Sequence, residues 1–189
     1  MSAPPAQTAI GRVLHSAVEI QAAVGRLAAS IARDYRRQPL LLLGVLKGAL
    51  CFTADLARAV SQAADGPSEI MVEYVFVERY GKSGSSGRPP SLGADFAVPV
   101  AGANVLVLDD IADNGRTLAF VKSFLEERRP ATLRTCALVD RPARREVEVT
   151  LDYVGFTIPD VFAIGYGLDY KEQYRNLPYL AELREGKTV

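Results

Sequence analysis

The chain has 189 residues, of which 49% are hydrophobic and 23% charged, and its 22 basic residues balance its 22 acidic residues. This length suits one domain and argues against two complete ones, and a zero net charge offers no overall basic field for nucleic acid. No apolar run approaches the roughly 20 residues of a membrane span, and the N-terminus lacks a secretory signal, so we expect a cytoplasmic protein.

The first half of the chain predicts helices and strands in alternation. After an N-terminal tail over residues 1–15, apolar positions at helical spacing predict an amphipathic helix over 16–35. The run LLLLGVL at 40–46 is too short for a typical helix and predicts a buried strand. A helix over 49–60 and a strand over 71–78 follow.

A polar stretch rich in Gly, Ser and Pro, KSGSSGRPPSLG at 82–93, comes after the second strand. These residues favour turns and loops, and loops of this length are often functional lids. A plain linker would have the same composition, so composition does not decide between a lid and a linker.

The second half continues the alternation, with a strand over 103–110, a helix over 116–128, a strand over 132–140, and short strands at 152–158 and 161–167. This order predicts an α/β domain with a mainly parallel sheet flanked by helices. In such sheets, ligands bind beyond the carboxyl ends of the strands. The sequence contains neither a G-x-G-x-x-G fingerprint nor a P-loop motif.

Several isolated features receive structural interpretations. Cys51 and Cys136 lie in apolar runs, so we expect buried thiols and neither a disulfide nor a metal pair. The basic pairs at 128–129 and 144–145 sit beside acids and are interpreted as solvated surface. His15, the only histidine, lies outside every motif and receives no role.

The segment VLVLDDIADNGRTL carries the clearest chemical signal. A hydrophobic strand runs into two adjacent acids, Asp109 and Asp110, and a third acid, Asp113, precedes Gly115 and Thr117. The glycine allows a tight turn, and the free N–H groups of the turn, with the N-terminus of the next helix, form an anion site. Carboxylates repel a neighbouring phosphate unless other groups compensate for their negative charge. A sugar diol, which donates hydrogen bonds, and a magnesium ion would do so.

Phosphate, ribose diol and metal are together the groups of phosphoribosyl pyrophosphate (PRPP). The alternative is that the segment is only a helix N-terminus, with Asp113 or Asn114 as its cap.

The same segment resembles the PRPP-binding motif of type I phosphoribosyltransferases: a hydrophobic strand, two acids, two further residues, Asp, a small polar residue, Gly, any residue and Thr. Two other stretches, LKGALCFTADL at 46–56 and DYVGFTIPDVFAIGYGLDYKEQYRNLPYL at 152–180, resemble the hypoxanthine/guanine branch. The resemblance covers roughly residues 16–180. It implies the type I phosphoribosyltransferase fold with a small hood and a flexible loop.

In domain terms, the resemblance implies one domain over residues 16–189, with a flexible hood loop over about 79–95 and a base-binding hood segment over about 152–189. The implied activity is purine salvage: transfer of the 5-phosphoribosyl group from PRPP to hypoxanthine and/or guanine, giving IMP or GMP and pyrophosphate, with Mg2+ as cofactor. The implied partners are small molecules only, without nucleic acid or membrane, and the implied assembly is a homodimer or homotetramer.

Residue roles carry over where this sequence matches the motifs. By resemblance, Asp113 is the catalytic acid/base residue near N7 of the purine, where a carboxyl group can exchange a proton. Lys47 and Gly48, after a peptide bond that can be cis, would bind pyrophosphate with Arg175. The PRPP loop would comprise Asp109, Asp110, Asp113, Asn114, Gly115, Arg116 and Thr117, with Asp109 and Asp110 on the ribose-diol and metal side.

The purine would be bound by the C-terminal segment. Phe162 would stack on the ring, Ala163 would offer backbone groups to the base edge, and Asp169 would lie at the purine site and bind a second magnesium. Arg79 and Tyr80 would belong to the flexible loop. Surface salt bridges remain the alternative for Asp169 and Arg175, a solvent-directed lysine for Lys47, and core packing for the run around Phe162.

This sequence departs from the family pattern at four positions. Asp109 stands for the usual Glu, Asn114 for Thr or Ser, and Arg79 for Ser. The fourth, Arg141 in VDRP, stands where the family has a Lys that donates to the purine 6-oxo group. Arg is bulkier and forked, so Arg141 is expected to bind purine and either to influence the choice among hypoxanthine, guanine and xanthine or to weaken catalysis.

Two other functions are compatible with parts of the pattern. The four departures would suit a non-catalytic, PRPP- or nucleotide-sensing regulator of the same fold, although no basic face or appended DNA-binding segment is evident. A receiver-type phosphoacceptor domain would place its acid pair on the first strand, whereas here the pair lies past mid-chain.

Overall fold

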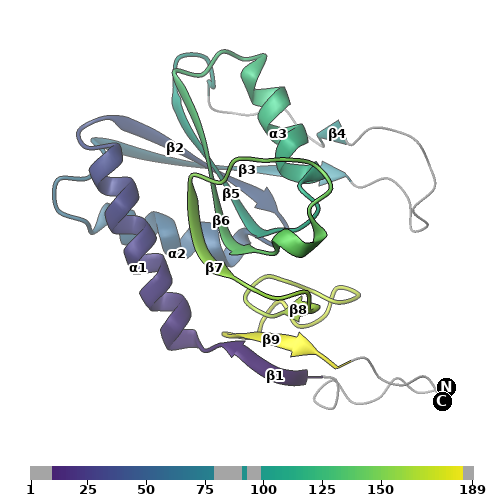
Figure 1. Cartoon of the computed structure of the whole chain (residues 1–189). Coiled ribbons are helices and arrows are strands. Elements are labelled where there is room, and N and C mark those ends of the chain that lie inside the picture. The colour runs from purple at the N-terminus through teal and green to yellow at the C-terminus, as the bar shows by residue number, and fades with distance from the viewer. Residues whose placement is uncertain (1–9, 79–90, 93–98, 185–189) are drawn as a thin grey trace.

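The computed structural model describes residues 10–78, 91–92 and 99–184. Figure 1 shows a larger twisted sheet with helices on both faces and a smaller sheet beside one end of it. In chain order the elements are β1 (Ile10–His15), α1 (Ala17–Asp34), β2 (Pro39–Leu46), α2 (Leu50–Ser61), β3 (Glu69–Glu78), β4 (Ser91–Leu92), β5 (Asn104–Ala112), α3 (Arg116–Glu126), β6 (Thr132–Asp140), β7 (Tyr153–Thr157), β8 (Ala163–Ile164) and β9 (Leu180–Leu183), with a short 3-10 turn at Pro142–Arg144.

The larger sheet has the order β4-β3-β2-β5-β6-β7. Strands β3, β2, β5, β6 and β7 run parallel, and the short β4 is antiparallel to β3. The predicted α/β fold with a mainly parallel sheet is therefore confirmed.

Strand β2 is apolar throughout because both faces of the sheet are covered there. Leu40 and Leu42 pack into one core with α1 and α2, whereas Leu41 and Leu43 pack into a second core with α3. Successive residues of a strand point to opposite faces, so a strand buried on both faces reads as the continuous run predicted for residues 40–46.

The smaller sheet is antiparallel, with the order β1-β9-β8. The prediction of a tail over residues 1–15 is wrong at its C-terminal end, because Ile10–His15 form β1 and pair with β9. The partner strand lies at the far end of the chain, beyond the reach of local patterns. The strand predicted at 161–167 is reduced to the two residues of β8, since Gly165 and Gly167 have φ of 98° and 103° and turn the chain.

Helix α1 begins where the sequence predicts. Ser16 and Glu19 form a capping box, in which the Ser16 side chain accepts from the Glu19 backbone and the Glu19 side chain accepts from the Ser16 backbone. None of the helices in the described ranges is long and apolar enough to cross a bilayer.

The predicted hood loop over about 79–95 falls mostly outside the described residues, as do Arg79 and Tyr80. Of that stretch, Ser91–Leu92 form β4 against the end of β3.

Candidate active site

The carboxyl ends of β2 and β5 lie side by side at one edge of the larger sheet, because the two strands pair in parallel. Ligands of open α/β sheets bind at this edge. A pocket of about 310 Å3 opens there, and residues predicted for pyrophosphate and metal meet in its lining: Lys47, Gly48, Asp109, Asp110, Asp169 and Arg175. The structure thus brings together residues that are up to 128 positions apart in the sequence (Lys47 to Arg175).

The backbone at Gly48 lies very close to the side chain of Asp110 and to Gly167. A Cβ on Gly48 would stand 1.7 Å from Asp110 Oδ2, and a Cβ on Gly167 would stand 2.0 Å from the Gly48 carbonyl oxygen. Only glycine therefore fits at either position without displacing its neighbour. The Leu46–Lys47 peptide bond is cis, as predicted.

The two acids at the end of β5 lie within the strand, which extends to Ala112. Asp109 is buried, with 5% of its surface exposed, whereas Asp110 is half-buried. Asp109 Oδ1 accepts from the Asp110 N–H at 3.1 Å, and Asp110 Oδ1 accepts from the Ile111 N–H at 2.9 Å. These bonds hold both carboxylates at the strand end, where they face the pocket.

The cations of the pocket are paired with acids of the segment after β8. Arg175 Nη2 lies 2.8 Å from Asp169 Oδ1, and Arg175 Nη1 donates to the Gly167 carbonyl at 2.7 Å. Lys47 Nζ donates to Glu172 Oε2 at 3.0 Å, and Arg175 Nη2 also lies 3.4 Å from Glu172 Oε1.

Glu172 was not among the predicted site residues. Its hydrogen bond from Lys47, together with the charge of Arg175, lowers the pKa of its carboxyl group. Its backbone has φ of 63°, and Lys171 and Tyr174 are also left-handed, at 52° and 75°. Such values are uncommon outside glycine, so this loop has a conformation that no sequence pattern indicated.

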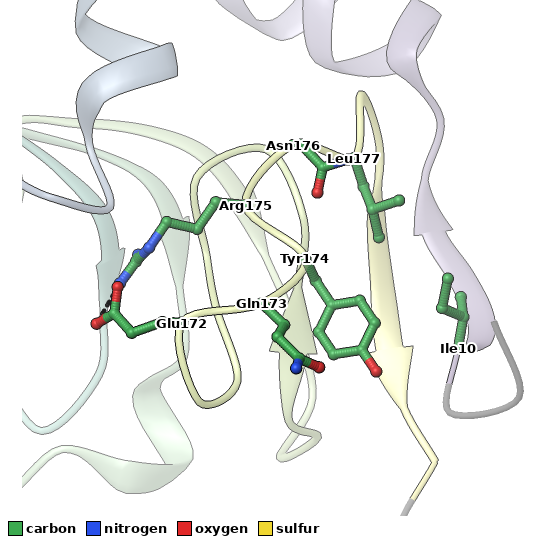
Figure 2. A pocket seen from close by; sticks show the side chains of 7 residues that line it. All are labelled: Ile10, Glu172, Gln173, Tyr174, Arg175, Asn176 and Leu177. Carbon is green, nitrogen blue, oxygen red and sulfur yellow. Dashed lines mark hydrogen bonds and ion pairs between the residues drawn. The ribbon is translucent and has the colours of Figure 1, made fainter. Parts of the chain in front are cut away.

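The other face of this loop borders a larger pocket, of about 550 Å3, which Figure 2 shows. Gln173 and Tyr174 lie between Ile10 and the pair formed by Glu172 and Arg175. Among the predicted site residues that the structure describes, only Arg175 lines this pocket. We place the candidate site in the smaller pocket, because the convergent charged groups lie there.

The predicted phosphate loop surrounds a second, shallow hollow after β5, lined by Asp113, Asn114, Gly115 and Thr117. Gly115 is the N-cap of α3 with φ of 85°, and a Cβ there would stand 2.2 Å from the Val147 carbonyl oxygen. The cap is therefore neither Asp113 nor Asn114, although Asn114 Oδ1 accepts from the Arg116 N–H at 3.1 Å.

Side chains from the turn after β6 hold this loop from outside. Arg116 pairs with Glu146, at 2.7 Å between Nη2 and Oε2. Arg145 Nε donates to the Asp113 carbonyl at 3.0 Å, its Nη2 donates to the Ala112 carbonyl at 3.2 Å, and it also pairs with Asp140.

The interpretation of the basic pair at 144–145 as solvated surface is confirmed for Arg144 and wrong for Arg145. Arg144 pairs with Asp160, and its side chain is 45% exposed, whereas the Arg145 side chain is only 13% exposed. Arg145 is half-buried because its guanidinium donates to main-chain carbonyls of the predicted phosphate loop, a long-range contact that local charge patterns do not reveal.

Arg141 lies directly against Asp113. Its Nη2 is 2.7 Å from Asp113 Oδ2, and its Nε donates to Asp113 Oδ1 at 3.1 Å. Arg141 Nη1 also donates to the Val161 carbonyl. Arg141 is 4% exposed, so the guanidinium is a buried charge that is paired with a carboxylate and a main-chain carbonyl.

The aromatic residue predicted to stack on a purine follows Val161. Phe162 is 39% exposed and meets Tyr170 edge-on, with ring centroids 5.6 Å apart. Ala163, by contrast, is buried. The base side of the predicted site therefore combines an accessible ring, a carboxylate and a buried guanidinium.

The acids at this edge suit a magnesium ion that is held partly by the protein and largely by the phosphates of a bound small molecule. Within the described part of the chain, no three His, Cys, Asp or Glu side chains gather closely enough to hold a metal by themselves. Asp109, Asp110 and Asp169 nevertheless line one pocket. Magnesium prefers oxygen ligands and often binds through one or two carboxylates plus substrate phosphates, so this donor set fits it.

Comparison with known proteins agrees with this arrangement. The model of the phosphoribosyl transferase domain family matches residues 14–171. A hypoxanthine-guanine phosphoribosyltransferase of Mycobacterium tuberculosis is 40% identical over 191 residues, covering 95% of this chain and 92% of the relative. A hypoxanthine phosphoribosyltransferase of Escherichia coli is 36% identical over 167 residues, covering 87% and 90%.

Solved structures resemble the whole fold. A hypoxanthine-guanine phosphoribosyltransferase from Bacillus anthracis superposes with a TM-score of 0.84 at 37% identity, covering 92% of this chain and 99% of that chain. A hypoxanthine phosphoribosyltransferase from Trypanosoma cruzi, in complex with the product IMP, superposes with a TM-score of 0.85 at 36% identity, covering 96% and 98%.

Proposed function

Because this chain belongs to the phosphoribosyltransferase family, we propose that it transfers the 5-phosphoribosyl group of PRPP to hypoxanthine and/or guanine, giving IMP or GMP and pyrophosphate. The observation that carries the proposal is the meeting at one sheet edge of an acidic strand end, a cationic loop and a glycine-capped helix N-terminus. Relatives with this activity in their names share 36% to 40% of their residues with the chain over most of its length.

The phosphate groups of PRPP would bind at two loops. The N–H groups around Gly115 and the hydroxyl of Thr117 would hold the 5-phosphate at the N-terminus of α3, where the helix dipole favours an anion. Asn114 and Arg116 belong to the same loop. Pyrophosphate would bind near Gly48, with Lys47 and Arg175 supplying positive charge.

The ribose and metal would be held by the acids of the same pocket. Asp109 and Asp110 would face the diol and one magnesium ion, and Asp169 a second one across the pocket. Bound magnesium would neutralise charge on the leaving pyrophosphate.

The purine would lie against Phe162, with its edge toward Ala163 and Arg141. As N9 bonds to the ribose C1′, the C1′–pyrophosphate bond breaks, and Asp113 accepts the proton that the base loses at N7. In the reverse direction the same carboxyl group returns that proton. Glycosyl transfer passes through an oxocarbenium-like transition state, which water would intercept, so the loop over about 79–95, with Arg79 and Tyr80, is proposed to cover the site.

A spectrophotometric assay tests this function directly. The purified protein would be given PRPP and magnesium with each of hypoxanthine, guanine, xanthine and adenine, and the same mixtures without PRPP would serve as controls. We expect turnover of a 6-oxopurine. If no base turned over while PRPP still bound, the chain would instead be a nucleotide-sensing member of the fold, and the four departures from the family pattern would explain the loss.

Assembly and location extend the proposal. We propose a homodimer or homotetramer, since Leu50 on α2 and Val72 on β3 are large apolar residues with 51% and 43% of their surface exposed. Light scattering of the purified protein would show a monomer if this is wrong.

We also propose a cytoplasmic location, because Cys51 and Cys136 are free thiols, as is usual in a reducing compartment.

A further inference from the structure

We propose that Arg141 is a positioning residue, which holds the carboxylate of Asp113 in a fixed orientation and ties it to the segment that stacks on the purine. This inference rests on the proposed function and concerns how this chain uses an arginine at that place. It differs from the expectation that Arg141 reads the purine directly.

The contact with Asp113 is bidentate, and Arg141 is much more deeply buried in it than Asp113. Arg141 bonds both carboxylate oxygens, at 2.7 Å and 3.1 Å. The Arg141 side chain is 5% exposed and the Asp113 side chain 36% exposed. A buried cation is costly to leave unpaired, so Arg141 cannot leave this carboxylate without penalty, whereas the open side of Asp113 remains accessible to a ligand.

An arginine does this in a way that a lysine cannot. The terminal torsion of an aspartate is broad and poorly fixed by its own rotamer preference. A planar guanidinium that donates to both oxygens sets the plane of the carboxylate, whereas an ammonium acts as a point charge and leaves that plane free. The acid/base group of the proposed reaction is therefore oriented before the base arrives.

Arg141 also joins two segments that would have to meet at the purine. Its backbone N–H donates to the Ala112 carbonyl at 3.0 Å, immediately before Asp113. Its Nη1 donates to the Val161 carbonyl, immediately before Phe162. One residue thus fixes the proton-accepting group relative to the stacking ring, and holding reacting groups in place in this way contributes to catalysis.

The pairing does not block Asp113. Each carboxylate oxygen has two lone pairs, of which the guanidinium uses one, so either oxygen can still accept a purine N–H. Three of the five guanidinium N–H groups are used, two on Asp113 and one on Val161. The positioning role predicts that Arg141 acts through Asp113, whereas direct reading of the base would operate without it.

The test is a double-mutant cycle with Arg141→Met, Asp113→Ala and the double variant, measured with hypoxanthine and with guanine. Bonds to charged groups of this kind correspond to a loss of about 10- to 100-fold. We expect Arg141→Met to lower kcat by that factor for both bases alike, with the KM for the base within about threefold. In the Asp113→Ala background the same change should cost less than about threefold, because the group that it orients is gone.

Arg144→Met is the matched control, since Arg144 lies in the same turn and pairs with Asp160 at the surface. We expect it to leave kcat within about twofold. An Arg141→Met variant that raised KM without lowering kcat, changed the ranking of the two bases, or lost the same factor in both backgrounds would overturn the positioning role in favour of direct base contact.

Thermal unfolding of the wild type and the three variants of the double-mutant cycle provides a readout that needs no activity. If the pair forms as described, Asp113→Ala lowers Tm more in the wild-type background, where it leaves Arg141 buried and unpaired, than in the Arg141→Met background. Additive shifts in Tm would overturn the pairing itself. Absence of turnover in the wild-type protein with coupled shifts in Tm would instead contradict the proposed function and leave the pairing in place.

Discussion

Two acid–cation pairs face the candidate site from its two ends and differ in their exposure. On the base side, Arg141 and Asp113 have side-chain exposures of 5% and 36%. On the pyrophosphate side, Lys47 and Glu172 have exposures of 55% and 65%. A buried pair is strongly destabilised when one partner is removed, whereas an exposed pair contributes little and is screened by salt.

The difference in burial assigns different roles to similar chemistry. The pair at Arg141 is a fixed part of the protein and sets geometry. The pair at Lys47 can be exchanged, because a multiply charged phosphate can displace a single exposed carboxylate. Glu172 bonds Lys47 and approaches Arg175, which are two of the cations proposed to bind pyrophosphate. In the proposed binding mode, the Glu172 carboxylate would therefore compete with pyrophosphate for these cations.

Replacing the acid of the fixed pair should have the largest effect. Asp113→Asn removes the proton acceptor, and loss of general acid–base help costs about 100-fold or more in turnover. Initial rates at saturating PRPP and hypoxanthine measure this loss, and Asp160→Asn, which changes a surface acid, is the control. Turnover within about threefold of wild type would show that Asp113 is not the acid/base residue.

Crowding the loop at Gly48, next to the exposed pair of Lys47 and Glu172, should have an intermediate effect on the binding of PRPP. In Gly48→Ala, the new methyl group would stand against Asp110 Oδ2, so the loop or the acid must shift. Overpacking of this kind costs about 1–3 kcal/mol, which corresponds to a rise of about fivefold or more in the KM for PRPP.

Gly25→Ala is the control for this change, because no atom of the residues that the structure describes lies within 4 Å of a Cβ at that position in α1. An unchanged KM for PRPP in Gly48→Ala would show that PRPP does not depend on this loop.

Removing the charge of Glu172 should have the smallest effect and the opposite sign. Glu172→Gln frees Lys47 for the ligand, so product inhibition by pyrophosphate should become stronger by up to about fivefold, the range of an exposed pair. The inhibition constant at low ionic strength measures this change, and Glu182→Gln, in an exposed pair with Arg12, is the control. Weaker inhibition would show that Glu172 assists the ligand and does not compete with it.

The pH dependence of that difference follows from the pKa of Glu172. The pairing lowers this pKa, so the carboxylate is charged at neutral pH and the pair is intact there. The pair is lost as pH falls through the lowered pKa. The difference between Glu172→Gln and wild type should therefore shrink toward acidic pH.

The parts of the fold that follow local patterns were predicted correctly. Helix α1 begins at its Ser16 cap, and β2 and β5 occupy nearly the residues expected, because continuous apolar runs mark strands buried on both faces. The positions of Asp110 and Gly115 at a strand end and a helix start also follow from the sequence, since a strand, a turn and a helix succeed one another within a few residues.

Contacts between distant segments were not predictable in this way. The pairing of β1 with β9 joins the two ends of the described chain. The charge pattern around Arg145 predicts a surface residue, whereas its side chain contacts the Ala112 and Asp113 carbonyls. Glu172 lies in a left-handed turn without a glycine.

The sequence by itself therefore determined the α/β class, the turn from β5 into α3 and the family to which the chain belongs, because each depends on residues close together along the chain. Only the tertiary structure decided that Arg141 is buried against Asp113 while Lys47 remains exposed beside Glu172. The physical reason is that burial and charge pairing depend on which segments pack together, and these segments are brought together by the order of strands in the sheet.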